Sequence, residues 1–152
     1  MDDRLFKAAM GKFATGVTVI TTEVDGEVHG MTANAFMSVS LDPKLVLVSV
    51  MHKAKTHDRI KQAGAFGVNI LAKDQANYSQ YFAGQIDEEI DIPIGKLENV
   101  PILEDTLVNV ACKLYDSHEA GDHTLFIGEV LNVVVKDEEP LLYFEGSYKE
   151  FK

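Results

Sequence analysis

The chain has 152 residues, of which 46% are hydrophobic and 25% are charged, and its formal net charge is −10. This composition fits one globular domain, residues 1–152, whose core needs neither disulfides nor metals. The excess of 24 Asp and Glu over 14 Lys and Arg argues against nucleic-acid or anionic-membrane partners, because both would be repelled. A single cysteine, no secretory signal pattern and no apolar run of about 18 residues lead us to expect a cytoplasmic protein.

The first third of the chain predicts one helix followed by strands. Asp2 is an N-cap candidate for an amphipathic helix whose apolar residues recur at helical spacing. Val17–Thr22 and Val28–Ser40 are rich in Val, Ile and Thr, which favours two strands, and Asp25-Gly26 between them suits a tight hairpin turn. The apolar run Leu45–Val50 predicts a strand that is buried on both faces.

The rest of the chain alternates short helices with strands. Thr56 is expected to cap a short helix that ends near Gly64, and Asp74 to cap another that runs through Tyr81. The expected strands are Phe66–Leu71, Leu107–Tyr115, Thr124–Lys136 with a bulge at Gly128, and Leu141–Phe144. Six or so strands, many joined as hairpins, and three small helices predict a closed or split antiparallel barrel. The acidic run in the loop 85–95 is interpreted as solvated surface.

Searches for nucleotide and metal motifs fail, and the failures narrow the possible functions. Neither a Rossmann glycine fingerprint nor a P-loop is present. The segment His118-Glu119-Ala120-Gly121-Asp122-His123 resembles a zinc-protease motif, but it is one residue too long and Gly-Asp suits a turn better than a helix. We therefore expect no metal site.

A basic segment interrupts the acidic chain directly after the buried strand. Its cations are Lys53, Lys55, Arg59 and Lys61, and Thr56 lies among them at the expected start of a helix. Free amide N–H groups, a hydroxyl and cations at a helix N-terminus can bind phosphate. A solvated basic helix face is the alternative interpretation.

The stretch Thr32-Ala33-Asn34-Ala35 carries small or polar residues where a barrel wall normally carries Val, Leu or Ile. Backbone amides and the Asn34 carboxamide at this position are able to hydrogen-bond the imide edge of a heterocycle. A polar barrel rim is the alternative interpretation.

Five segments together resemble the flavin reductase-like family. They are Gly16–Thr22, Gly30–Phe36, Ser38–Pro43, Phe82–Gly84 and Gly121–Gly128, and the resemblance runs from about Phe6 to Tyr148. Within the family the chain is most similar to the small NADH-using reductases of two-component aromatic hydroxylases that act on phenol or 4-hydroxyphenylacetate. The resemblance implies a mainly β fold, a six-stranded antiparallel split β-barrel (Greek key) with a few short peripheral helices, and a homodimer.

The resemblance also implies the residues of the site. The isoalloxazine would be lined by Thr32, Ala33, Asn34, Ala35 and Phe36. The ribityl chain and phosphate would lie along Ser49, Val50, Met51, Lys53, Lys55 and Thr56. The flavin site would be closed by Phe82 and Ala83, and the nicotinamide would lie near Ser38, His123 and Tyr148.

The implied reaction is hydride transfer from NADH or NADPH to N5 of FAD or FMN, with release of reduced flavin to a separate oxygenase. His123 is the candidate catalytic residue, although a turn histidine that bonds the backbone remains an alternative. A second hypothesis is a flavin-binding or electron-transfer protein on the same barrel without nicotinamide-dependent activity. The segment Gly121–Thr124, on the presumed nicotinamide side, favours the enzyme.

Overall fold

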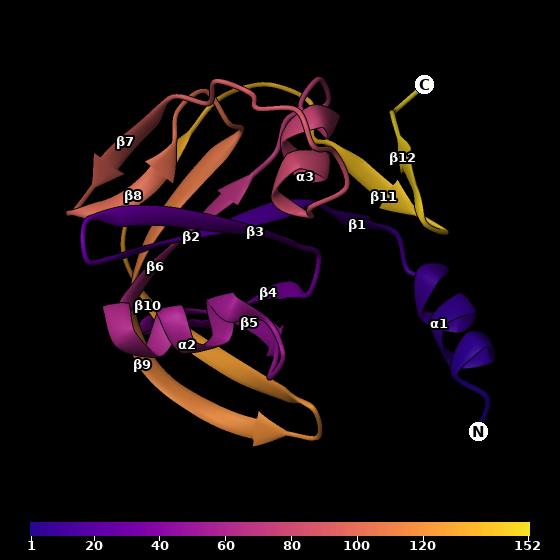
Figure 1. The fold of residues 1–152 in the computed structure, drawn as a ribbon, viewed down its shortest axis with the longest axis horizontal. Helices are drawn as coiled ribbons and strands as arrows, with labels where there is room; N and C mark the ends of the chain where they lie inside the picture. Colours follow the sequence, from indigo (N-terminus) through magenta and orange to yellow (C-terminus); the bar gives the residue numbers. More distant parts are fainter.

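The computed structural model describes residues 1–152 and is built mainly from β-strands (Figure 1). The helices are α1 (Asp3–Gly11), α2 (Lys55–Ala63) and α3 (Ala76–Phe82). The strands are β1 (Thr15–Gly16), β2 (Thr18–Val24), β3 (Glu27–Ala33), β4 (Phe36–Leu41), β5 (Lys44–Met51), β6 (Ala65–Ile70), β7 (Ile94–Leu97), β8 (Val100–Leu103), β9 (Val108–Ala120), β10 (His123–Val135), β11 (Leu142–Phe144) and β12 (Ser147–Lys149). None of the helices is long and apolar enough to cross a membrane.

Seven strands form one antiparallel sheet in the order β3-β2-β6-β9-β10-β5-β4. The expected hairpin between β2 and β3 is confirmed, because Asp25 and Gly26 have φ angles of 53° and 79°. Positive φ at both central residues is what a type I′ hairpin turn requires. A smaller sheet, β1-β11-β12, and the hairpin β7–β8 complete the fold.

The mainly β, antiparallel prediction is confirmed, but the six-stranded barrel is not confirmed, since the main sheet has seven strands and one predicted strand is two. Val28–Ser40 breaks at Asn34-Ala35, where the Phe36 amide donates to the Asn34 carbonyl in a tight turn. The resulting strands β3 and β4 occupy opposite edges of the sheet. Since Ala33 and Phe36 are at most about 11 Å apart along the chain, the sheet must curl until its edges approach there. No ladder joins these edges, so the sheet is not closed.

The predicted helix end and bulge are confirmed, but the predicted helix caps are not. Gly64 ends α2 with a φ of 68°, and a register shift at Ile127/Gly128 confirms the bulge. The predicted caps are wrong, because α2 and α3 begin after Ala54 and Gln75 without a side-chain cap. Thr56 is instead buried within the first turn of α2, and Asp74 lies before the cap position of α3.

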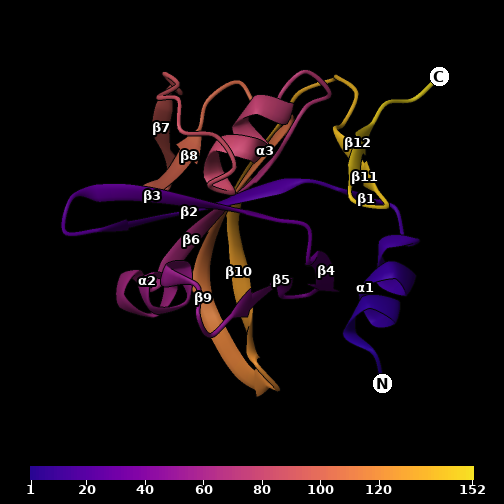
Figure 2. The same cartoon turned by 45° about the vertical axis from the view of Figure 1, so that its right-hand side comes forward.

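The core lies inside the curled sheet and is closed by α2. Ile20, Val48, Phe66 and Phe126 are fully buried there together with Ile60 of α2. Helix α1 stands apart from this core, beside β4 and the C-terminal strands (Figure 2). The helix begins as expected, since the Asp2 carboxylate accepts from the Arg4 amide, yet none of its residues is buried.

Candidate functional site

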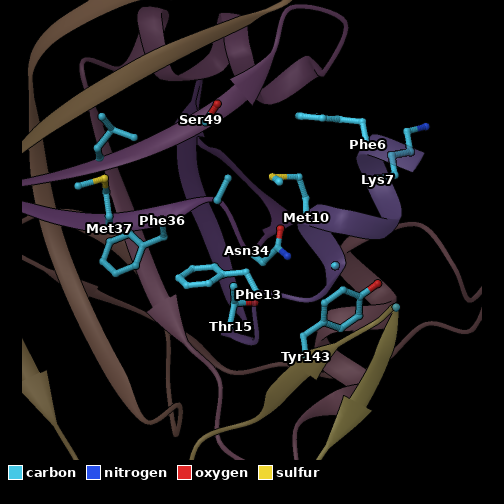
Figure 3. A pocket seen from close by; sticks show the side chains of 14 residues that line it. Phe6, Lys7, Met10, Phe13, Thr15, Asn34, Phe36, Met37, Ser49 and Tyr143 are labelled. Atoms are coloured by element: carbon cyan, nitrogen blue, oxygen red, sulfur yellow. The ribbon is translucent and has the colours of Figure 1, made fainter. Parts of the chain in front are cut away.

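A cavity of about 860 Å³ lies between α1 and the break that separates β3 from β4 (Figure 3). Its wall on the sheet side includes Asn34, Ala35 and Phe36, and Ser49 of β5 extends it. The C-terminal strands contribute Tyr143. Eight of its 14 lining residues are hydrophobic, which is typical of a site for a flat organic ligand with few polar groups.

A smaller cavity of about 130 Å³ adjoins the first, because Asn34 and Tyr143 line both. It is bordered by Thr32 and Ala33 of β3, by Ala83 after α3, and by Tyr148 of β12. The two cavities therefore meet at the turn where the sheet edges approach each other.

Two polar groups of this region have no partner within the chain. The Thr15 hydroxyl oxygen is buried without a hydrogen bond, and Thr15 lines the large cavity. The Asn34 carboxamide, near the centre of the view in Figure 3, also makes no side-chain hydrogen bond. Together with the apolar walls, these free donors and acceptors fit an aromatic heterocycle that carries both polar and apolar edges.

Hydrogen bonds join three elements around the small cavity. The Thr32 hydroxyl donates to the Ser79 carbonyl of α3 at 2.6 Å, and the Ser79 hydroxyl lies 2.7 Å from the Tyr148 hydroxyl. Strand β3, helix α3 and the C-terminal hairpin are thus fixed relative to one another. Thr32 therefore positions the cavity wall through α3, and its hydroxyl proton is already used.

The residues predicted from the sequence fall into two groups. Eight of them line at least one of the two cavities: Thr32, Ala33, Asn34, Ala35, Phe36, Ser49, Ala83 and Tyr148. The other eight line neither cavity: Ser38, Val50, Met51, Lys53, Lys55, Thr56, Phe82 and His123. Phe82 lies behind the wall, where its ring packs against the backbone of Gly30.

Helix α1 supplies residues that sequence reasoning missed as site residues. Phe6, Lys7 and Met10 of α1 line the large cavity together with Phe13, which follows the helix, and Met10 and Phe13 lie on either side of Asn34 in Figure 3. The apolar spacing of the helix was recognised, but spacing alone does not say whether an apolar face meets a core or a cavity. The exposed fractions of Phe6 and Met10, 54% and 56%, show that this face is not part of the core.

The basic segment lies beyond the cavity wall, at the start of α2. Lys53 and Lys55 are exposed, and neither takes part in an ion pair. No side chain caps the helix, so its first amide groups are not occupied by a side-chain acceptor. Within the cavity lining itself, Lys7 of α1 is the one cation.

His123 begins β10 and pairs with Met51 of β5. Its Nδ1 lies 2.7 Å from Asp122 Oδ1, and hydrogen bonding to His123 holds the pKa of the Asp122 carboxyl below its ordinary value. The imidazole is fixed by this contact with a neighbouring carboxylate rather than by the backbone contact of the alternative interpretation. Its side chain remains 36% exposed, so it is open to a ligand.

Comparison with known proteins identifies the family. The family model described as "Flavin reductase like domain" matches residues 10–152. The chain belongs to this family. It is 46% identical over 149 residues to an NADH-dependent flavin reductase of a Rhodococcus species, covering 96% of this chain and 85% of that protein.

One further relative and two solved structures agree with this family assignment. The reductase component of 4-hydroxyphenylacetate 3-monooxygenase from Thermus thermophilus is 38% identical, over 95% of this chain and 93% of its own. A solved flavin reductase in its native state superposes with a TM-score of 0.98 at 54% identity, covering 100% of this chain and 99% of the other. An NADH:FAD oxidoreductase of Streptomyces globisporus, solved with NAD and FAD fragments, gives a TM-score of 0.90 at 34% identity, covering 99% and 93%.

Proposed function

We propose that this flavin reductase family member uses NADH to reduce FAD or FMN and supplies the reduced flavin to a separate oxygenase. The observation that carries the proposal is the large, mostly apolar cavity at the break between β3 and β4, with the unpartnered Asn34 carboxamide in its wall. Relatives that match nearly the whole chain are named as NADH-dependent flavin reductases or as monooxygenase reductase components.

The flavin ring is assigned to the large cavity. When bound, flavin supplies an acceptor for the hydride of NADH. The Asn34 carboxamide and the Thr15 hydroxyl would hydrogen-bond its polar edge, while Phe36 of the sheet and Phe13 of the N-terminal segment would contact its faces. Ala35, Ala33 and Thr32 carry short side chains, which leave room for the ring at the sheet edge.

The flavin phosphate is assigned to the region from Ser49 to the start of α2. Ser49 lines the cavity, and β5 leads from it through Met51 to the basic segment. Lys53 and Lys55 and the uncapped amides of α2 are then the groups that would bind a phosphate. This route leaves the ring in the cavity and the charge at the surface.

The nicotinamide of NADH is assigned to the side where Tyr148, Ala83 and the small cavity lie. His123 begins the inner strand β10 and Ser38 lies in the edge strand β4, and neither residue lines the large or the small cavity. The chain would contribute orientation and exclusion of water, since hydride transfer requires close approach of the donor and acceptor rings. The Thr32–Ser79–Tyr148 hydrogen bonds would keep that wall rigid. His123 would bind the nucleotide rather than the flavin.

The active form is proposed to be a homodimer. Large apolar side chains are exposed on β4 and along the C-terminal half of β10, including Leu41 at 80% and Val135 at 69%. Phe13, beside the large cavity, is 79% exposed. An isologous partner would bury such side chains and complete a cavity that is open to solvent. Light scattering that found an active, flavin-loaded monomer would contradict the dimer.

The activity is tested by mixing the purified protein with NADH and FMN or FAD in air and following the nicotinamide absorbance. Rapid NADH oxidation that requires both protein and added flavin supports the proposal. Repeating the assay without oxygen separates flavin reduction from reoxidation by air. Tight flavin binding without NADH oxidation would instead support a flavin-binding or electron-transfer protein.

A further inference from the structure

Three ligand-type side chains from distant parts of the chain meet at the far end of β5, outside both cavities. They are His52, in the turn after β5, His57 in the first turn of α2, and Glu119 near the end of β9. One ligand atom from each lies within 4.8 Å of the others. The imidazole rings of His52 and His57 are 5.2 Å apart, and His52 Nε2 is 2.6 Å from Glu119 Oε2.

The neighbours of the cluster orient these groups. His57 is buried, and its Nδ1 lies 3.1 Å from Asp58 Oδ1, so its Nε2 points toward the cluster. A carboxylate on the far nitrogen of a histidine is the arrangement that fixes the tautomer of a metal-binding imidazole. Glu119 Oε1 accepts from the Thr124 hydroxyl at 3.1 Å, which leaves Oε2 for the cluster.

Whether hydrogen bonds within the chain satisfy every group of this cluster depends on the tautomer of His57. When the proton is on Nε2, it is donated to the Thr124 hydroxyl and the cluster is satisfied; when the proton is on Nδ1, it is not. His57 Nε2 lies 2.7 Å from the same Thr124 hydroxyl that donates to Glu119. Thr124 has one hydroxyl proton, so it cannot donate to both His57 and Glu119 at once. A neutral His57 that donates from Nδ1 to Asp58 therefore presents an unprotonated Nε2 to a hydroxyl already in use. A cation on this nitrogen would satisfy its lone pair.

We propose that His52, His57 and Glu119 form a Zn²⁺ site. Two imidazole nitrogens and one carboxylate oxygen are a common zinc ligand set, with water at the fourth position. Tetrahedral ligands at about 2.0–2.2 Å from the ion lie about 3.3 Å from one another, which small side-chain rotations here can reach. His52 and Glu119 are 39% and 64% exposed, so an ion can enter from solvent.

The proposed site differs from the metal motif that the sequence suggested and excluded. Of the segment 118–123 only Glu119 takes part, since His118 turns to Asp116 at 3.3 Å and His123 to Asp122 at 2.7 Å. The zinc would join the turn after β5 and helix α2 to the β9–β10 hairpin. It would thereby fix the basic segment, which begins directly after His52, without contacting either cavity.

The test measures Zn²⁺ binding by calorimetry to the full-length chain after dialysis against a chelator, with Co²⁺ absorption as a check on coordination. His52→Ala and Glu119→Gln each remove one exposed ligand. His118→Ala is the matched control, because it removes an exposed histidine of the same hairpin that lies outside the cluster. Circular dichroism of the metal-free proteins shows whether each variant folds, and either ligand variant alone suffices for the comparison.

We expect one Zn²⁺ per chain, a Co²⁺ spectrum of four-coordinate type and a rise in the unfolding temperature when Zn²⁺ is added. Affinity should fall by more than about tenfold in each ligand variant and stay unchanged in His118→Ala. Absence of binding by the unaltered chain overturns the proposal. Equal binding by the ligand variants, or loss of binding in His118→Ala, overturns it as well. None of these readouts depends on flavin reduction, so the proposed activity stands or fails separately.

Discussion

Replacement of Asn34 by alanine tests whether this residue contributes to flavin binding without contributing to the stability of the fold. The carboxamide has no side-chain hydrogen bond within the chain, and the residue is exposed between β3 and β4. Asn34→Ala should therefore change the free energy of unfolding by less than about 0.5 kcal/mol. If the amide donates one hydrogen bond to the flavin and accepts another, the loss is about 1–3 kcal/mol of binding free energy. The dissociation constant for FMN or FAD should then rise about 5- to 150-fold.

The assay is a titration of flavin fluorescence at equilibrium, with thermal unfolding of the flavin-free protein measured in parallel. Asn77→Ala is the matched control, because it removes an exposed asparagine of α3 that lines neither of the two cavities at the sheet edges. The reasoning fails if Asn34→Ala binds flavin as tightly as the unaltered chain. It also fails if the variant loses substantial stability, because the carboxamide would then stabilise the turn between β3 and β4 rather than bind the ligand.

Three further changes test other parts of the site. In steady-state and binding assays, His123→Ala should raise the Michaelis constant for NADH a few-fold to about a hundredfold and leave flavin affinity intact. A collapse of flavin affinity would refute this assignment. Lys53→Ala combined with Lys55→Ala should weaken flavin binding by about 1.5–3 kcal/mol per charged hydrogen bond, whereas unchanged affinity at low salt would exclude side-chain contacts to the phosphate. Gly30→Ala should destabilise the fold by about 1–3 kcal/mol in denaturant unfolding, because its Cβ would lie 2.5 Å from the Phe82 ring; unchanged stability would show that the ring moves aside freely.

The site was predictable in part because its inner wall is continuous in sequence. Residues 32–36 line the cavities as a single stretch around the break in the sheet, and their small and polar character was visible without a structure. Lys7 and Tyr143 could not be assigned in the same way. They reach the cavity from the two ends of the chain, and no local pattern links them to residue 34.

The sequence by itself determined the local features whose cause lies within a few residues. The turn at Asp25-Gly26 and the left-handed end of α2 at Gly64 follow from positive φ angles that few residue types adopt. The family could also be named from its motifs, which run through almost the whole chain.

Only the tertiary structure decided which distant segments meet. The break after Ala33 sends the next strand to the opposite edge of the sheet, and this places α1 over a cavity instead of a core. The same sheet order brings Glu119 to His52 and His57 across more than sixty positions of sequence. Periodicity specifies which face of an element is apolar, but strand order and sheet curvature specify what that face contacts, and both depend on pairings between residues far apart in the chain.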